Sequence, residues 1–349
     1  MMNDRNLNLD LLRLLGVLII MVAHASPPAW LSQLRNFGTP LLVVASALTY
    51  SLIYAAKELH PLEFYKKRLA RLILPAWIFL SAFFLAFLAV SRGLDKDFPF
   101  SIRQVVMSYG FLEGIKFLWI FKVYILLALV TPVALALNRR ISSDFTYFTV
   151  LILAYLTYEV MVSLISPAVH GGAALLFDEV IFIVVPYAIL YLYGFRLSAL
   201  SRLQVLCLSF VSFALFACLA ISKQIESGYF VPTQDYKYPP TVYYFSYAFC
   251  ALNLVYLACR ELRIVRPRCA SIIRWLSSNS LWVYLWHIMG FYIWKFTIGY
   301  SDGDFLTFVI KAIYLLAFGV VVTLIQKNFV SRFISQESAW GRRMAFLLT

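Results

Sequence analysis

The sequence predicts an all-α protein: a polytopic integral membrane bundle of about ten transmembrane helices. Of the 349 residues, 62% are hydrophobic and 13% are charged, whereas about a quarter of the residues in a soluble domain are charged. The mean hydropathy is +0.81. Aromatic residues make up 17% of the chain, as expected for a protein with interfacial aromatic belts. Lipid is therefore the expected solvent for most of the chain.

Ten apolar runs are long enough to span, since about 20 residues cross a hydrocarbon core of roughly 30 Å. No polar stretch between them is long enough to fold alone, so residues 1–349 are expected to form a single transmembrane domain. The polar segment 92–114 is a candidate for a short interfacial helix. The predicted runs are 9–27, 37–55, 71–91, 115–137, 145–166, 178–196, 203–222, 241–259, 279–297 and 305–326.

The distribution of Lys and Arg predicts the orientation of the bundle. The net charge is +13, but the basic residues sit in short loops rather than on one solvated surface, which argues against nucleic-acid binding. With both termini in the cytoplasm, roughly two thirds of the Lys and Arg fall in cytoplasmic loop segments, Arg139 and Arg196 among them. We expect the first run to be a span rather than a cleavable signal peptide.

Cysteine and histidine spacing gives no sign of a disulfide framework or a metal site. The five cysteines contain no CxxC pair and lie mostly in or beside apolar runs, where they are expected to be buried hydrophobes. His60 and His170 are in predicted loops and are expected to be solvated. Metal-protease, serine-hydrolase and phosphate-loop motifs are absent.

The first apolar run carries three polar residues that need an explanation: Asp10, Arg13 and His24. An arginine in a membrane helix is costly, although snorkelling with Asp10 as an i,i+3 partner would reduce the cost. His24 lies about 16 Å further along the helix and on the same face as Arg13. A structural hydrogen bond would explain His24 alone, but the shared face favours a polar path along the helix.

A basic segment precedes the third run, with Lys67, Arg68 and Arg71 at its start. Guanidinium groups one helical turn apart suit a phosphate-bearing ligand. The alternative is the ordinary basic anchor of a cytoplasmic loop.

Two further intramembrane residues are candidates for function. His287 lies near the middle of the ninth run and needs a partner from another helix, whether for packing or for chemistry. Glu159 lies in the fifth run, where a carboxylate suggests a functional site unless it is neutral or paired.

These segments together resemble the acyltransferase family 3 of membrane proteins. Asp10-Leu-Leu-Arg13, followed by ten residues and His24, is similar to that family's opening motif, and Arg68-x-x-Arg71 is similar to its RxxR motif. The segment from Ser280 through Tyr284 to His287 resembles its late motif, and the stretch beginning at Trp119 resembles its fourth helix. The second run departs from the family pattern, with Ala47 where glycine is frequent.

The resemblance implies O-acylation of a carbohydrate, with acetyl-CoA as the cytoplasmic donor and a cell-envelope glycan or its lipid-linked precursor as the acceptor. It implies a stand-alone, multi-pass protein of the bacterial inner membrane that needs no metal. His24 would be the general base. Arg13, with Asp10, would hold the donor or stabilise an oxyanion. Arg68, Arg71 and Lys67 would bind the donor phosphates. His287, Glu159, Trp119, Tyr284 and Ser280 are further candidates.

Two other functions stay open at this point. A transporter or flippase for a lipid-linked sugar would also use charged residues within a helical bundle, but it predicts broken helices in paired halves, and none is evident. A non-catalytic relative that binds a glycan or lipid is the third possibility.

Overall fold

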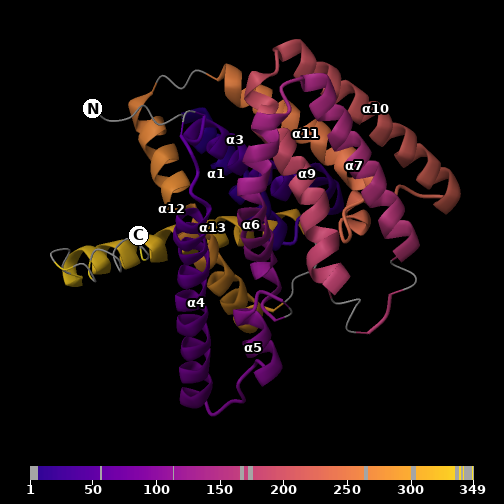
Figure 1. Cartoon of the computed structure of the whole chain (residues 1–349). Helices are drawn as coiled ribbons and strands as arrows, with labels where there is room; N and C mark the ends of the chain where they lie inside the picture. Colours follow the sequence, from indigo (N-terminus) through magenta and orange to yellow (C-terminus); the bar gives the residue numbers. More distant parts are fainter. Residues whose placement is uncertain are drawn as a thin grey trace. The chain divides into compact units, whose positions relative to one another are not determined.

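The computed structural model describes residues 7–55, 57–112, 114–165, 169–171, 176–262, 266–299 and 304–334, with 338, 341 and 348. Within these residues the regular structure is helical, and the expectation of an all-α protein is confirmed. Figure 1 shows the helices in chain order. The long helices are α1 (Leu7–His24), α3 (Gly38–Ile53), α4 (Pro61–Gly93), α6 (Trp119–Arg140), α7 (Asp144–Ile165), α9 (Phe182–Arg196), α10 (Arg202–Ser227), α11 (Val242–Glu261), α12 (Pro267–Thr297) and α13 (Phe305–Phe333).

Nine helical segments of the described chain are long and apolar enough to cross a membrane. They correspond to nine of the ten predicted runs, which confirms a polytopic bundle. The remaining run, 279–297, which is the ninth in chain order, is helical and lies within α12. Its Trp, Tyr and His side chains lower its hydropathy, so it does not count among the nine by composition alone.

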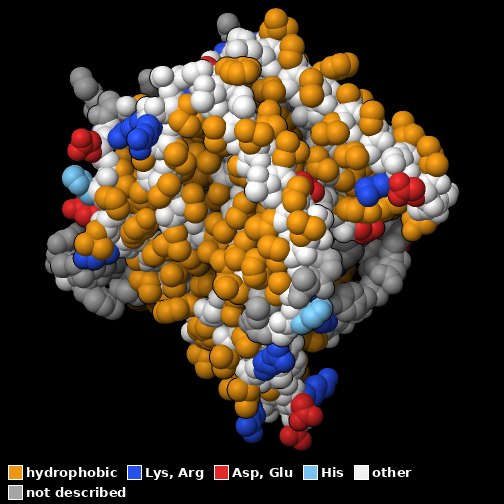
Figure 2. Space-filling view, turned by 45° about the vertical axis from the view of Figure 1, so that its right-hand side comes forward, with side chains coloured by type: hydrophobic (Ala, Val, Ile, Leu, Met, Phe, Trp, Pro, Cys, Tyr) orange, Lys and Arg blue, Asp and Glu red, His pale blue; other side chains and the backbone are white. Residues whose placement is uncertain are grey.

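The surface carries the side chains expected of a protein in lipid. Large apolar residues are exposed along several helices, among them Phe210 on α10, Phe145 on α7 and Ile313 on α13. Figure 2 shows one face on which hydrophobic side chains predominate and charged side chains are few. Exposed apolar area on this scale requires an apolar surrounding.

The chain forms two compact units, and their boundary passes through α1, α6 and α12. Unit 1 comprises 1–20, 29–59 and 129–277, and unit 2 comprises 21–28, 60–128 and 278–349. The expectation of a single domain over 1–349 stays a prediction.

Helices of unit 1 pack closely where glycine removes a side chain. A Cβ at Gly194 on α9 would lie 2.6 Å from the Cβ of Ala47 on α3 and 3.1 Å from the Val44 carbonyl oxygen. Only glycine fits this approach without displacing backbone. A glycine at position 47 of α3 would allow close helix packing, and here the glycine that allows it is Gly194 on the facing helix α9. Figure 1 also shows α10 beside α11.

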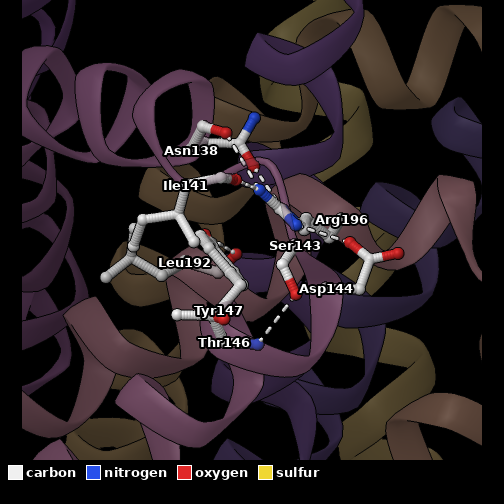
Figure 3. Close-up of polar contacts among 8 residues, drawn as sticks. All are labelled: Asn138, Ile141, Ser143, Asp144, Thr146, Tyr147, Leu192 and Arg196. Carbon is white, nitrogen blue, oxygen red and sulfur yellow. Dashed lines mark hydrogen bonds and ion pairs between the residues drawn. The ribbon is translucent and has the colours of Figure 1, made fainter.

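Arg196, at the end of α9, binds the turn between α6 and α7 (Figure 3). Its guanidinium donates to the side chain and backbone carbonyl of Asn138, at 3.0 Å each, and to the Ile141 carbonyl. It also contacts the Asp144 carboxylate at 2.5 Å and lies 4.0 Å from the ring centroid of Tyr147. A residue predicted as a loop charge is therefore buried and joins three helices.

Arg196→Lys is expected to lower the free energy of unfolding by about 2–3 kcal/mol, because lysine keeps the charge but loses the planar fork of donors. Thermal unfolding in detergent measures this. The control is Arg202→Lys, an exposed position on α10, which should change stability by less than about 0.5 kcal/mol. Equal melting temperatures for the two variants would contradict the structural role of Arg196.

Unit 2 contains the short helix anticipated in 92–114. It is α5 (Ile102–Tyr109), and a reciprocal capping box between Ser101 and Gln104 begins it.

The helices α12 and α13 are joined by polar contacts. Trp286 donates to the Gln326 side-chain oxygen at 2.6 Å, and Lys327 donates to the Asn279 side-chain oxygen at 2.7 Å. These contacts fix the rotation of α12 about its own axis and so the direction in which His287 points.

Candidate active site

The central feature of unit 2 is a contact between two histidines. His24 is the last residue of α1, and His287 is fully buried in α12. The Nδ1 atom of His24 lies 2.7 Å from the Nε2 atom of His287, and the two rings are nearly parallel, with centroids 5.0 Å apart. The predicted need of His287 for a partner from another helix is confirmed.

The hydrogen bonds assign the protons of this pair when both rings are neutral. His287 Nδ1 contacts the Tyr284 carbonyl oxygen, which can only accept, so Nδ1 carries the proton. His287 Nε2 then has the lone pair and accepts from the Nδ1–H of His24. This leaves the lone pair of His24 on its Nε2 atom, in the form a general base requires.

Aromatic side chains surround the pair. The ring of Phe117 lies 4.1 Å from that of His24 and 4.6 Å from that of Phe291, centroid to centroid. Tyr284 donates from its hydroxyl to the Phe117 carbonyl oxygen at 2.7 Å. The Tyr284 hydroxyl therefore anchors the segment before α6 next to the histidines.

Lys311 on α13 is a site residue that the sequence analysis missed. Its side chain is 4% exposed, its ammonium donates to the Ser26 hydroxyl at 3.2 Å, and it lies 5.1 Å from the Phe291 ring centroid. Ser26 follows His24 by two residues and has a positive φ of 63°. A lysine inside an apolar run was the available signal, although its nearness to His24 depends on the tertiary fold.

Asp10 and Arg13 form a separate polar group in unit 1. Their side chains are 3.7 Å apart, which confirms the i,i+3 pairing. Ser277 donates to Asp10 at 2.9 Å, and Arg13 donates to the Thr49 hydroxyl, which in turn donates to the Ala45 carbonyl oxygen at 2.7 Å. Arg13 is thereby held in one direction, with 30% of its side chain exposed.

The basic motif of the third run lies on α4, in unit 2. Arg71 is exposed, and Arg68 is half-buried with its guanidinium 5.9 Å from the Tyr124 ring centroid. Lys67 is exposed and lies 3.4 Å from the Glu63 carboxylate. An exposed ion pair of this kind contributes little to the free energy of folding. Lys67 can therefore leave Glu63 and bind another anion.

The remaining candidates lie on α12, α6 and α7. Tyr284 is in contact with the histidines, Trp119 begins α6, and Ser280 lies on α12. Glu159, on α7 in unit 1, is half-buried, and its Oε1 atom has no hydrogen-bond partner among the described residues. The described residues contain no group of three His, Cys, Asp or Glu side chains that could hold a metal ion.

The chain is thus a polytopic helical membrane protein with a histidine pair inside one unit and a basic motif at the start of α4. A family model described as an acyltransferase domain matches residues 6–325, nearly the whole chain, and the chain belongs to the acyltransferase 3 family. It is a membrane acyltransferase with an acyl donor and an acceptor substrate. Comparisons with curated proteins and with solved structures give no match.

Proposed function

We propose that this chain transfers an acetyl group from cytoplasmic acetyl-CoA to a hydroxyl of a cell-envelope glycan or its lipid-linked precursor, in the bacterial inner membrane. The observation that supports this best is the His24–His287 contact at 2.7 Å. This contact leaves the basic lone pair of His24 on Nε2, and aromatic rings lie beside the imidazole.

In the proposed reaction, the acceptor hydroxyl donates to His24 Nε2. As the hydroxyl oxygen attacks the thioester carbonyl carbon, its proton moves to His24, and His287 Nε2 stabilises the imidazolium through the Nδ1–H of His24. The carbon–sulfur bond then breaks, and the thiolate takes up the proton. The products are the O-acetyl ester and free CoA.

Developing negative charge on the thioester oxygen needs a donor. The Lys311 ammonium, next to Ser26, is a suitable group, because a cation in a low-dielectric site interacts strongly with an oxyanion. We assign Lys311 this role.

The donor is expected to bind through its phosphates at Arg68, Arg71 and Lys67, since guanidinium groups bind phosphate in bidentate geometry. Arg13 lies on the same helix as His24, roughly 16 Å before it. Its fixed direction from Asp10 and Thr49 suits a group that holds the extended part of the donor.

Arg68→Gln and Arg71→Gln are each expected to raise the KM for acetyl-CoA about tenfold with little change in kcat, because each loses one charge-assisted phosphate contact. Initial rates with purified protein in nanodiscs measure this. The control is Arg92→Gln, exposed near the other end of α4, whose KM should be unchanged. Equal KM values for all three variants would refute donor binding at this motif.

The function itself is tested by proton NMR of the envelope glycan from cells with and without the chain. We expect acetyl ester signals that require the chain, and transfer of label from radioactive acetyl-CoA to glycan by the purified protein. Identical glycan spectra, or movement of a lipid-linked sugar across vesicles without any need for acetyl-CoA, would overturn the proposal.

A further inference from the structure

Unit 1 contains a further polar site, on segments other than the helices that carry the two histidines. It is formed by the segment from α2 (Ala29–Leu34) into α3 and by the segment from η4 (Thr233–Tyr236) into α11. The amide Nδ2 of Asn36 donates to the Thr233 hydroxyl at 2.9 Å, and both the backbone and hydroxyl of Thr233 donate to the Gln33 oxygen at 3.0 Å. These contacts hold the two segments together. We call the side chains of these two segments the polar cluster.

The polar cluster has more buried hydrogen-bonding atoms than it satisfies. Within the part of the chain that the structure describes, six buried side-chain atoms of the cluster have no hydrogen-bond partner: Gln33 Nε2, Arg35 Nε, Asn36 Oδ1, Thr39 Oγ1, Gln234 Oε1 and Thr241 Oγ1. Asn36 and Thr39 are only 1% and 2% exposed. Buried polar groups are nearly always paired, so a concentration of unpaired donors and acceptors points to a polar ligand.

The cluster also contains two basic side chains, Arg35 and Lys237, and one exposed carboxylate, Asp235. Lys237 is 8% exposed, and burial, followed by the charge of Arg35, lowers the pKa of Lys237 to about 7. The two cations are therefore close enough to repel each other. Two helix N-termini add positive potential, because α3 and α11 both begin here without a side-chain cap.

Aromatic rings complete the site. The Lys237 ammonium lies 5.4 Å from the ring centroid of Tyr238 and 5.9 Å from that of Tyr244. Tyr244 is fully buried, whereas Tyr238 is 53% exposed. Amides and hydroxyls beside an accessible aromatic ring are the groups that recognise sugar rings, and two cations select an anionic substituent.

The site lies at the end of α3 opposite to Arg13's partner Thr49. The 16 residues of α3 span about 24 Å. If the basic end of unit 1 faces the cytoplasm, as expected, then the polar cluster faces the side where envelope glycans are found.

We propose that the polar cluster binds an acidic carbohydrate, with its carboxylate between Arg35 and Lys237 and its hydroxyls at the unpaired amides and threonines. This rests on the proposed function in that the ligand is the acceptor glycan of the acyl transfer.

The test is isothermal titration calorimetry on the full chain in neutral detergent, without acetyl-CoA. The probes are tetragalacturonate and the same tetrasaccharide with its carboxylates reduced to alcohols. We expect tetragalacturonate to bind at least about tenfold more tightly than the reduced form, and Arg35→Gln and Lys237→Gln each to lose about tenfold. Arg202→Gln, an exposed charge at the other end of unit 1, should bind as the unchanged chain does.

The variant Thr39→Val is the control for loss of binding through misfolding. Valine removes an unpaired hydroxyl at constant shape, so the unliganded variant should be as stable as the unchanged chain or more so, yet bind the sugar more weakly. Binding should also weaken as pH rises from 6 to 9, because Lys237 loses its positive charge while Arg35 keeps its own. The other titratable groups that face the Lys237 ammonium are Tyr238 and Tyr244. Unchanged affinity in Thr39→Val and Lys237→Gln would overturn the proposal.

Other outcomes separate this proposal from the proposed function. Equal binding of the acidic and reduced sugars, or displacement of tetragalacturonate by phosphatidylglycerol at equal concentration, would overturn the acidic-sugar site and leave acetyl transfer standing. Selective binding of tetragalacturonate by a chain that transfers no acetyl group from acetyl-CoA would support the site and refute the transfer.

Discussion

Replacing His24 with alanine is expected to lower the rate of acyl transfer by about 10²–10⁴-fold, the usual contribution of a positioned general base. The affinity for acetyl-CoA should stay within about twofold, because the proposed phosphate-binding residues are on α4. Initial rates with radioactive acetyl-CoA, together with NMR detection of the ester, measure both effects.

The control for His24→Ala is His170→Ala, since His170 is exposed and lies outside the histidine pair. It should leave kcat and KM unchanged. His24 is half-buried, so its truncation should cost little stability, and melting in detergent checks this. Transfer at a normal rate by a well-folded His24→Ala protein would remove His24 from the chemistry and the proposed mechanism with it.

The helices were predictable from the sequence because lipid imposes a single requirement, which is about 20 apolar residues per crossing. The i,i+3 pair of Asp10 and Arg13 was predictable for the same kind of reason, since it depends on the geometry of one helix. The His24–His287 contact joins residues 263 positions apart. The sequence indicated that His287 needs a partner, but only the packing of the helices identifies His24 as that partner.

Charges in loops were the least predictable feature. Arg196 was expected to be a cytoplasmic loop charge, and Arg139 likewise, yet both make specific contacts in unit 1. Arg139 donates to the carbonyl oxygens of Tyr54 and Lys57, at 2.8 and 2.7 Å, beyond the end of α3. Sequence composition gives the sign of a charge near a membrane, but not whether it is solvated or used to hold backbone carbonyls.

The second large effect is expected at His287, which acts through His24 and is a positioning residue. His287→Ala should lower kcat by roughly 10²-fold, because His24 loses the acceptor that orients its ring and stabilises its imidazolium. His287→Gln should recover most of this loss, since a glutamine oxygen can take the place of Nε2 and accept from the Nδ1–H of His24. The KM for either substrate should change little in both variants.

A merely structural role for His287 predicts a different pattern. His287 is fully buried, as is its neighbour Ile288, so Ile288→Ala creates a comparable cavity on the same helix and should cost a similar 2–5 kcal/mol of stability. If cavity formation alone explained the loss of activity, Ile288→Ala would lose as much kcat as His287→Ala, and glutamine at position 287 would give no recovery. Recovery by glutamine, together with near-normal kcat in Ile288→Ala, would instead assign the effect to the hydrogen bond at His24 Nδ1. The glutamine variant keeps an acceptor for this bond, whereas the alanine variant has none.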